Sequence, residues 1–121
     1  MQVDALSTEQ SGYEAAAQLL ERGGKVDAIV AASDLIAIGA LRALQERQLA
    51  VPTDVSVIGF DDIPAASLTN PPLSTVMQDT SRAGEALVNT LLRLVSEEHA
   101  EGVVLPTKLV LRKSCGAART A

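Results

Sequence analysis

The hydrophobic and polar positions of the first half of the chain follow helical and strand-like periods in turn. Apolar residues keep helical spacing over residues 8–22, and a glycine pair then predicts the helix end. Residues 26–32 and 55–60 are short, nearly continuous apolar runs, and a second helical pattern begins between them, after Ser33-Asp34. The order helix, strand, helix, strand with fully apolar strands predicts an α/β fold, in which a parallel sheet is flanked by helices on both faces.

The segment after the second apolar run has a loop-like pattern and then a strand-like one. Asp62 is expected to cap a short helix that has Pro64 in its first turn, and two adjacent prolines then break the chain. Residues 73–78, LSTVMQ, alternate between two faces, which predicts a strand.

The last part of the chain is predicted to hold one long helix and a final strand. Residues 81–97 carry leucines on one stripe, and either Asp79 or Thr80 can cap the helix. The run VVLPTKLVLR then has strand character, interrupted by a proline. The tail 116–121 is expected to be disordered.

The helix after Ser33-Asp34 has more apolar surface than one packed face needs. We expect one face to pack on the sheet and the other to meet a second subunit, with burial inside its own domain as the alternative. Its apolar residues are Ile36, Ile38, Ala40, Leu41, Ala43 and Leu44.

Composition narrows the class of protein. The 121 residues suit one domain or part of one, and a chain with 47% hydrophobic but 2% aromatic residues must build an aliphatic core. With 10 basic against 15 acidic residues and no basic run, this segment is not expected to bind nucleic acid directly. A single cysteine, Cys115, excludes an internal disulfide and suits a reducing cytoplasm. The sequence has no membrane-spanning run and no signal-peptide pattern.

Polar residues follow both predicted strands, where α/β sheets bind their ligands. Ser33-Asp34 comes after the first strand and Asp61-Asp62 after the second. Carboxylates at this edge can accept paired hydrogen bonds, so donor-rich neutral ligands such as sugars and purines suit them. Helix capping is the competing role for Asp34 and Asp62, and it explains Asp61 less well.

No catalytic arrangement is recognisable in the sequence. We find no Gly-rich phosphate loop and no nucleophile elbow, and the adjacent Asp61 and Asp62 cannot act as an acid/base pair in an extended segment. His99 stands alone in a polar turn, and Cys115 has no partner base. We therefore expect no enzyme, no cofactor and no metal site.

Three motifs together resemble one known family. The runs DAIVAASDLIAIGALRALQERQLAVPTDVSVIGFDD, NPPLSTVMQ and LPTKLVLRKS occur in this order, and the resemblance covers residues 7–115. They resemble the effector-binding region of the lactose-repressor/galactose-repressor (LacI/GalR) transcriptional regulators, which is similar to periplasmic sugar-binding proteins. The resemblance implies the C-terminal part of a two-lobed sensor with its ligand between the lobes.

The resemblance also implies how the chain is divided. Residues 1–78 would form the C-terminal lobe, residues 79–102 a crossover and a helix of the N-terminal lobe, and residues 103–115 the return strand to the hinge or C-terminal lobe, with 116–121 as a tail. The chain then looks like the last third of a cytoplasmic repressor. Operator DNA would be bound only through an N-terminal domain outside this sequence, and a ligand would act by shifting the population of lobe arrangements.

The residues that would bind the ligand are carried over one at a time. Asp61 would be a ligand acceptor, and Gln78 would close the crossover strand facing the pocket. Ser33 stands where sugar-binding members often have asparagine, and Ser7 where some members stack an aromatic ring. Phe60 occupies the place of an aromatic found beside the aspartate in the periplasmic relatives, with packing under the sheet edge as its other role.

The family's subunit contacts map to two segments, Leu35 to Arg42 and Ala66 to Asn70. A homodimer would use the candidate contact residues Leu35, Ile38, Ala40, Leu41, Ser67 and Thr69.

The function implied is therefore that of a fragment of a sugar-sensing, dimeric transcriptional regulator, with a periplasmic sugar receptor as the alternative. The leucine stripe of helix 81–97 also needs cover, which predicts self-association of this chain, including exchange of that helix.

Overall fold

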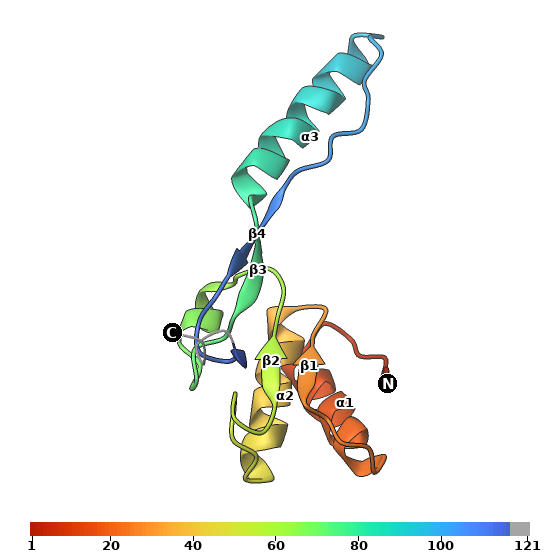
Figure 1. Cartoon of the computed structure of the whole chain (residues 1–121). Helices are drawn as coiled ribbons and strands as arrows, with labels where there is room; N and C mark the ends of the chain where they lie inside the picture. The colour runs from red at the N-terminus through yellow and green to blue at the C-terminus, as the bar shows by residue number, and fades with distance from the viewer. Residues whose placement is uncertain (117–121) are drawn as a thin grey trace. The chain divides into compact units, whose positions relative to one another are not determined.

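The order of elements along the chain agrees with the sequence pattern. The computed structural model describes residues 1–116, so most of the predicted disordered tail, 116–121, lies outside the described residues. The elements are α1 (Glu9–Glu21), β1 (Ala28–Val30), α2 (Asp34–Glu46), β2 (Ser56–Ile58), the 3-10 helix η1 (Pro64–Ser67), β3 (Thr75–Gln78), α3 (Thr80–Val95) and β4 (Thr107–Val110) (Figure 1).

Polar side chains begin each of the three long helices. Thr8 Oγ1 accepts a hydrogen bond from the Ser11 N–H at 3.1 Å at the start of α1, and Ser33 caps α2 in the same way. Asp79, one of the two predicted candidates, caps α3. The predicted cap of the short helix is wrong, because η1 has no side-chain cap.

β1 and β2 form the predicted parallel pair, with Ile29 opposite Val57. These two side chains are buried together with alanines of both α1 and α2, so the two helices cover one face of the pair. On the other face, Val30 is 82% exposed. The sequence predicted helical cover on both faces of the sheet, but within residues 1–116 the helices cover one face of this strand pair.

α1 and α2 cross at two glycines. A Cβ atom on Gly39 would lie 2.5 Å from the Tyr13 backbone nitrogen and still closer to the Glu9 carbonyl oxygen, and one on Gly12 would collide with the backbone of Ile36. Both glycines are buried, so the helices touch backbone to backbone at this point. This close contact allows small alanines to fill a core that has almost no aromatic residues.

The chain divides into two compact units. The first contains Met1–Met77 together with residues 109–116, and the second contains Gln78–Lys108. In the first unit, the Gly59 and Asp61 N–H groups donate to the Ser74 and Val76 carbonyls, so residues 74–77 continue the parallel sheet beside β2. β3 and β4 form a second two-stranded sheet.

The second unit is built around α3, which has no buried residue. The return segment lies against one side of the helix, where Val103 and Leu105 line a hollow with Ala86 and Leu87. The apolar side chains of α3 stay 55–72% exposed: Leu87, Val88, Leu91, Leu92, Leu94 and Val95.

Candidate functional site

The carboxyl ends of β1 and β2 bring three of the predicted ligand-binding positions together. The Ser7 hydroxyl donates to Ser33 Oγ at 3.0 Å, and the Asp34 N–H donates to the Phe60 carbonyl at 2.8 Å. Segments far apart in sequence therefore meet at this edge of the sheet, as the parallel topology requires. Asp61 follows Phe60 directly, and both side chains are half-buried.

Ser33 caps α2, and the Asp34 carboxylate bonds to groups outside this helix. Ser33 is buried and its hydroxyl caps α2 by accepting from the Ile36 N–H at 3.4 Å. Asp34, fully buried in the first turn of α2, accepts instead from two groups outside the helix. Its Oδ2 takes the Ile63 N–H at 2.9 Å and its Oδ1 the Thr75 hydroxyl at 2.6 Å.

The two adjacent aspartates after β2 form a turn with unusual backbone angles. Asp61 has φ = 111° and Asp62 has φ = 56°. The first value lies outside the left-handed helical region that non-glycine residues occasionally adopt, so this residue is strained. That the two carboxylates do not form an acid/base pair stays a prediction.

Arg112 is a residue that the sequence analysis missed. Its Nη2 donates to Asp62 Oδ1 at 2.7 Å, and both side chains are only about one-fifth exposed, at 20% and 19%. Its Nη1 donates to the Leu73 carbonyl at 2.8 Å. The Asp62 carboxylate is thus paired with a residue of the same chain. No local pattern could have revealed a pair that is separated by 50 residues in the chain.

Gln78 is the last residue of β3 and is exposed. It belongs to the second unit, whereas Asp61 belongs to the first. Its contribution to a ligand site therefore stays a prediction, as does the role of the Phe60 ring.

The predicted subunit contacts are partly accessible. Leu35 is 40% exposed and Ile38 is half-buried, but Ala40 and Leu41 are 1% and 7% exposed and pack inside the first unit. The face of α2 left for a partner is thus narrower than the sequence predicted, because residues of α1 lie beside Ala40 and the segment at Val51 and Pro71 lies beside Leu41. Leu68, which lies within the predicted contact segment Ala66 to Asn70, is 84% exposed.

The predicted contact residues Ser67 and Thr69 have hydroxyl groups that already bond to nearby backbone. The Ser67 hydroxyl donates to the Pro64 carbonyl, and that of Thr69 to the Ala66 and Pro71 carbonyls. Both hydroxyl groups thus use their hydrogen within this segment and offer a partner only an acceptor oxygen.

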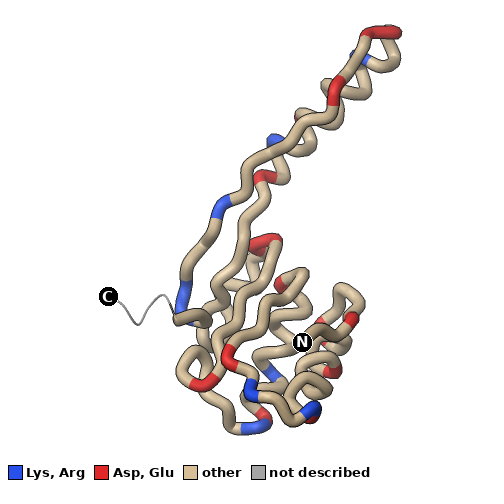
Figure 2. Tube along the Cα trace, turned by 45° about the vertical axis from the view of Figure 1, so that its right-hand side comes forward, with Lys and Arg blue, Asp and Glu red and all other residues tan. Residues whose placement is uncertain are grey.

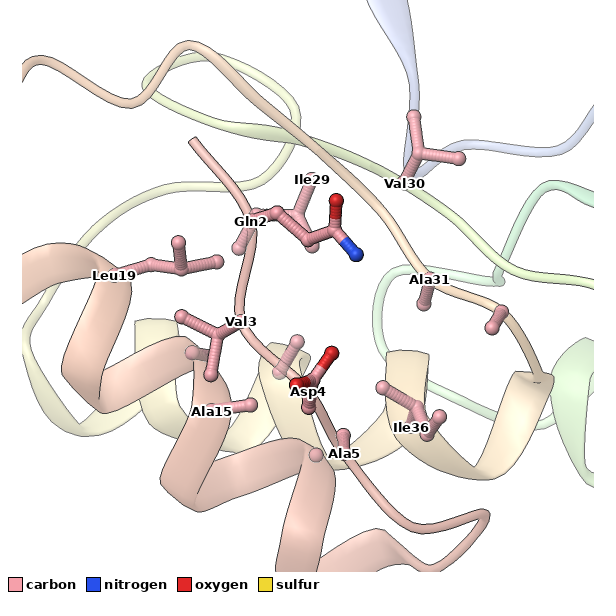
Figure 3. Close-up of a pocket in the computed structure, with 14 residues that line it drawn as sticks. Gln2, Val3, Asp4, Ala5, Ala15, Leu19, Ile29, Val30, Ala31 and Ile36 are labelled. Carbon is pink, nitrogen blue, oxygen red and sulfur yellow. The ribbon is translucent and has the colours of Figure 1, made fainter.

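A cavity of about 360 Å³ adjoins this edge of the first unit, because its lining includes Ala32 and Ile36 on either side of Ser33. Figure 3 shows Val3, Ala15 and Leu19 on one side of it and Ala31 and Ile36 on the other. Its lining is mostly apolar and includes none of the five predicted ligand-binding residues. Aliphatic walls with few polar groups suit a hydroxyl-rich ligand less well than the edge beside Asp61 does.

Basic and acidic residues are interspersed among residues 1–116. Figure 2 shows Lys and Arg positions distributed along the trace, with Asp and Glu positions among them. Several are used in pairs within the first unit, such as Arg42 with Glu9 at 3.4 Å and Arg47 with Glu21 at 3.2 Å. Within residues 1–116, no helix is both long and apolar enough to cross a membrane.

These features define an α/β lobe with a polar edge at the carboxyl ends of parallel strands. Residues 2–115 match the family described as the periplasmic binding protein-like domain. The chain belongs to this domain family and, within it, to the LacI family of transcriptional regulators.

The chain is similar to several named regulators. It is 42% identical to a lactose operon repressor of Rhizobium radiobacter, over 87% of this chain and 94% of that one. It is 43% identical to the HTH-type transcriptional regulator MalR of Streptomyces coelicolor, over 94% of this chain but 33% of that one. The chain thus spans about a third of the length of MalR, but nearly the whole of that lactose operon repressor sequence. These names replace the alternative of a periplasmic sugar receptor with a regulator.

Solved structures agree with this family. The chain matches a Lac repressor dimer bound to operator and the anti-inducer ONPF, with a TM-score of 0.84 and 38% identity over 89% of this chain and 38% of that one. It also matches a LacI family regulator from Arthrobacter sp. FB24 in complex with lactose, with a TM-score of 0.78 and 39% identity over 91% of this chain and 42% of that one.

Proposed function

We propose that this chain is the part of a sugar-sensing transcriptional regulator that holds one wall of the effector site and contributes to dimerisation. The observation that carries the proposal is the meeting of Ser7, Ser33 and the Phe60-Asp61 segment at the carboxyl ends of β1 and β2. Asp61 is the proposed acceptor for sugar hydroxyls, and Gln78 is proposed as a further ligand-binding residue. That a relative was solved with lactose supports a sugar as the ligand class.

The test uses the complete product of the reading frame that contains this chain. Lactose, galactose, maltose and cellobiose are titrated calorimetrically into the wild type and into Asp61→Ala. Loss of paired hydrogen bonds to a carboxylate, each worth about 1.5–3 kcal/mol, weakens sugar binding by at least about 100-fold. Binding to the promoter DNA beside its gene, followed by fluorescence anisotropy, stays as in the wild type.

Asp4→Ala is the matched control, because Asp4 is an exposed carboxylate that lines the other cavity. It is expected to bind sugar like the wild type. Unchanged sugar affinity in Asp61→Ala, or a loss confined to Asp4→Ala, would remove Asp61 from the site.

The proposed dimer forms through the exposed face around Leu35, Ile38 and Leu68, with Ser67 and Thr69 beside it. A solved relative is a dimer, which supports this arrangement. The same account places the protein in the cytoplasm, with operator DNA bound by a domain outside these 121 residues. Because α3 leaves its leucines exposed, the chain on its own is expected to self-associate.

A further inference from the structure

The turn at Asp61–Asp62 is held in a backbone conformation that it would not adopt by itself. Among residues 1–116, the non-glycine residues with positive φ are Gln48, Asp61, Asp62 and Glu97. Gln48 and Glu97 lie just after α2 and α3, where left-handed residues commonly end helices. A helix end does not explain the positive φ of Asp61 and Asp62, because these residues follow a strand. Strained residues persist only where the surroundings over-determine them.

The side chains of Asp34 and Thr75 accept hydrogen bonds from the backbone of this turn. The Thr75 hydroxyl donates to Asp34 Oδ1 at 2.6 Å and lies 3.4 Å from the Asp62 N–H, which it can accept. Asp34 Oδ2 accepts the Ile63 N–H at 2.9 Å. Both N–H groups on the far side of the strained residue are therefore engaged by one buried pair of side chains.

The pair is buried so completely that a purely incidental contact is a poor explanation. Asp34 and Thr75 are both 0% exposed. A buried carboxylate is tolerated only when donors compensate for the loss of water, and here both oxygens have donors. Gly59 leaves the space for the carboxylate, since a Cβ there would collide with Asp34 Oδ1. A glycine directly after β2 is therefore needed to make room for the Asp34–Thr75 pair.

We infer that Asp34 and Thr75 are positioning residues for the effector site: they fix the turn so that the Asp61 carboxylate is already aimed at the ligand before the ligand binds. This inference rests on the proposed function, because it assumes that Asp61 is the ligand acceptor. A pre-formed acceptor raises affinity because binding then costs less ordering of the turn.

The test compares Thr75→Val with Thr75→Ser. Valine keeps the shape but leaves Asp34 Oδ1 without its donor, whereas serine keeps the hydroxyl. Ser114→Ala is the matched control, because Ser114 is also 0% exposed and its hydroxyl bonds to Val57 O at 2.6 Å and Ser74 N at 2.7 Å, away from the turn. Affinity is measured in the complete gene product for whichever of lactose, galactose, maltose and cellobiose binds the wild type best, alongside thermal unfolding.

The expected result is a tenfold or greater loss of sugar affinity in Thr75→Val, with Thr75→Ser and Ser114→Ala within threefold of the wild type. Thermal unfolding is expected to show Thr75→Val and Ser114→Ala destabilised alike. Wild-type affinity in Thr75→Val would overturn the inference. An equal loss in Ser114→Ala would also overturn it, because the effect would then follow general stability.

If the wild type binds none of these sugars, the proposed function fails. Amide hydrogen exchange in the 121-residue chain then tests whether Asp34 and Thr75 fix the turn at Asp61–Asp62. Exchange at Asp62 and Ile63 that is at least tenfold faster in Thr75→Val, but not in Thr75→Ser or Ser114→Ala, supports it. Unchanged exchange at these two amides would refute it.

Discussion

Replacing Gly39 by alanine tests whether the backbone contact between α1 and α2 holds the first unit together. In an exposed helix this substitution stabilises by about 1 kcal/mol, since glycine is the poorer helix former. Here the new Cβ would lie 2.5 Å from the Tyr13 nitrogen, whereas ordinary contact begins at 3.4 Å. The Glu9 carbonyl oxygen would be closer still, so α1 must move away by more than about 1 Å, and such a gap removes about half of each dispersion contact across the crossing.

The net effect is a loss of stability. Overpacking of this kind costs about 1–3 kcal/mol, and we take the upper value because backbone atoms cannot move aside. After subtraction of the gain in helix propensity, we expect Gly39→Ala to be destabilised by about 2 kcal/mol. At about 4–8 °C per kcal/mol for a domain of this size, the Tm falls by about 10 °C.

The assay uses the single tyrosine of the chain as a local reporter. Tyr13 lies at the crossing, where its hydroxyl donates to Glu46 at 2.6 Å and Arg42 lies 4.4 Å from the ring centre. Tyrosine fluorescence during urea unfolding therefore follows the first unit. Gly84→Ala on α3 is the control, because nothing lies within 4 Å of a Cβ there, and its helix content by circular dichroism is expected to rise. A Gly39→Ala variant as stable as the wild type would refute the close crossing.

Three further outcomes follow from the described contacts. Arg112→Leu should lower the free energy of unfolding by about 2 kcal/mol in urea, because it leaves the mostly buried Asp62 without its charged partner. In a double-mutant cycle, Asp62→Leu should restore the stability of Arg112→Leu, whereas no coupling between the two substitutions would contradict the pair. Leu91→Glu on α3 should shift the light-scattering mass of the chain toward the monomer, and a wild-type chain that is already monomeric at micromolar concentration would refute self-association. Leu35→Glu should weaken dimerisation of the complete gene product in sedimentation, whereas an unchanged dimer would exclude this face of α2.

The sequence was informative wherever a local period or a cap decided the structure. Helical spacing located α1, α2 and α3, and the apolar runs located β1 and β2 within a few residues. Asp79 was among the predicted caps because capping needs only neighbours within one turn. Cover on one sheet face was overestimated, since a fully apolar strand indicates two covered faces without saying which segment supplies the second.

What the sequence could not provide are contacts made across long separations. Asp34 was expected to cap a helix, yet its carboxylate binds Thr75, 41 residues away. Asp62 was also given a capping role, but Arg112 holds it from the end of the chain. Ala40 and Leu41 seemed available for a partner because no local period reveals that both are buried in the first unit, where Ala40 lines a cavity with residues of α1 and Leu41 lies beside Val51 and Pro71. In each case the deciding partner has no local signature.

The most direct test of the central claim is a crystal structure of the complete gene product with the tightest-binding of the four sugars. The account predicts that the Asp61 carboxylate accepts hydrogen bonds from sugar hydroxyls at the carboxyl ends of β1 and β2, with Ser33 and Gln78 beside the ligand. A sugar seated instead in the cavity between α1 and the segment at Val3, with Asp61 bonded only to protein groups, would contradict it.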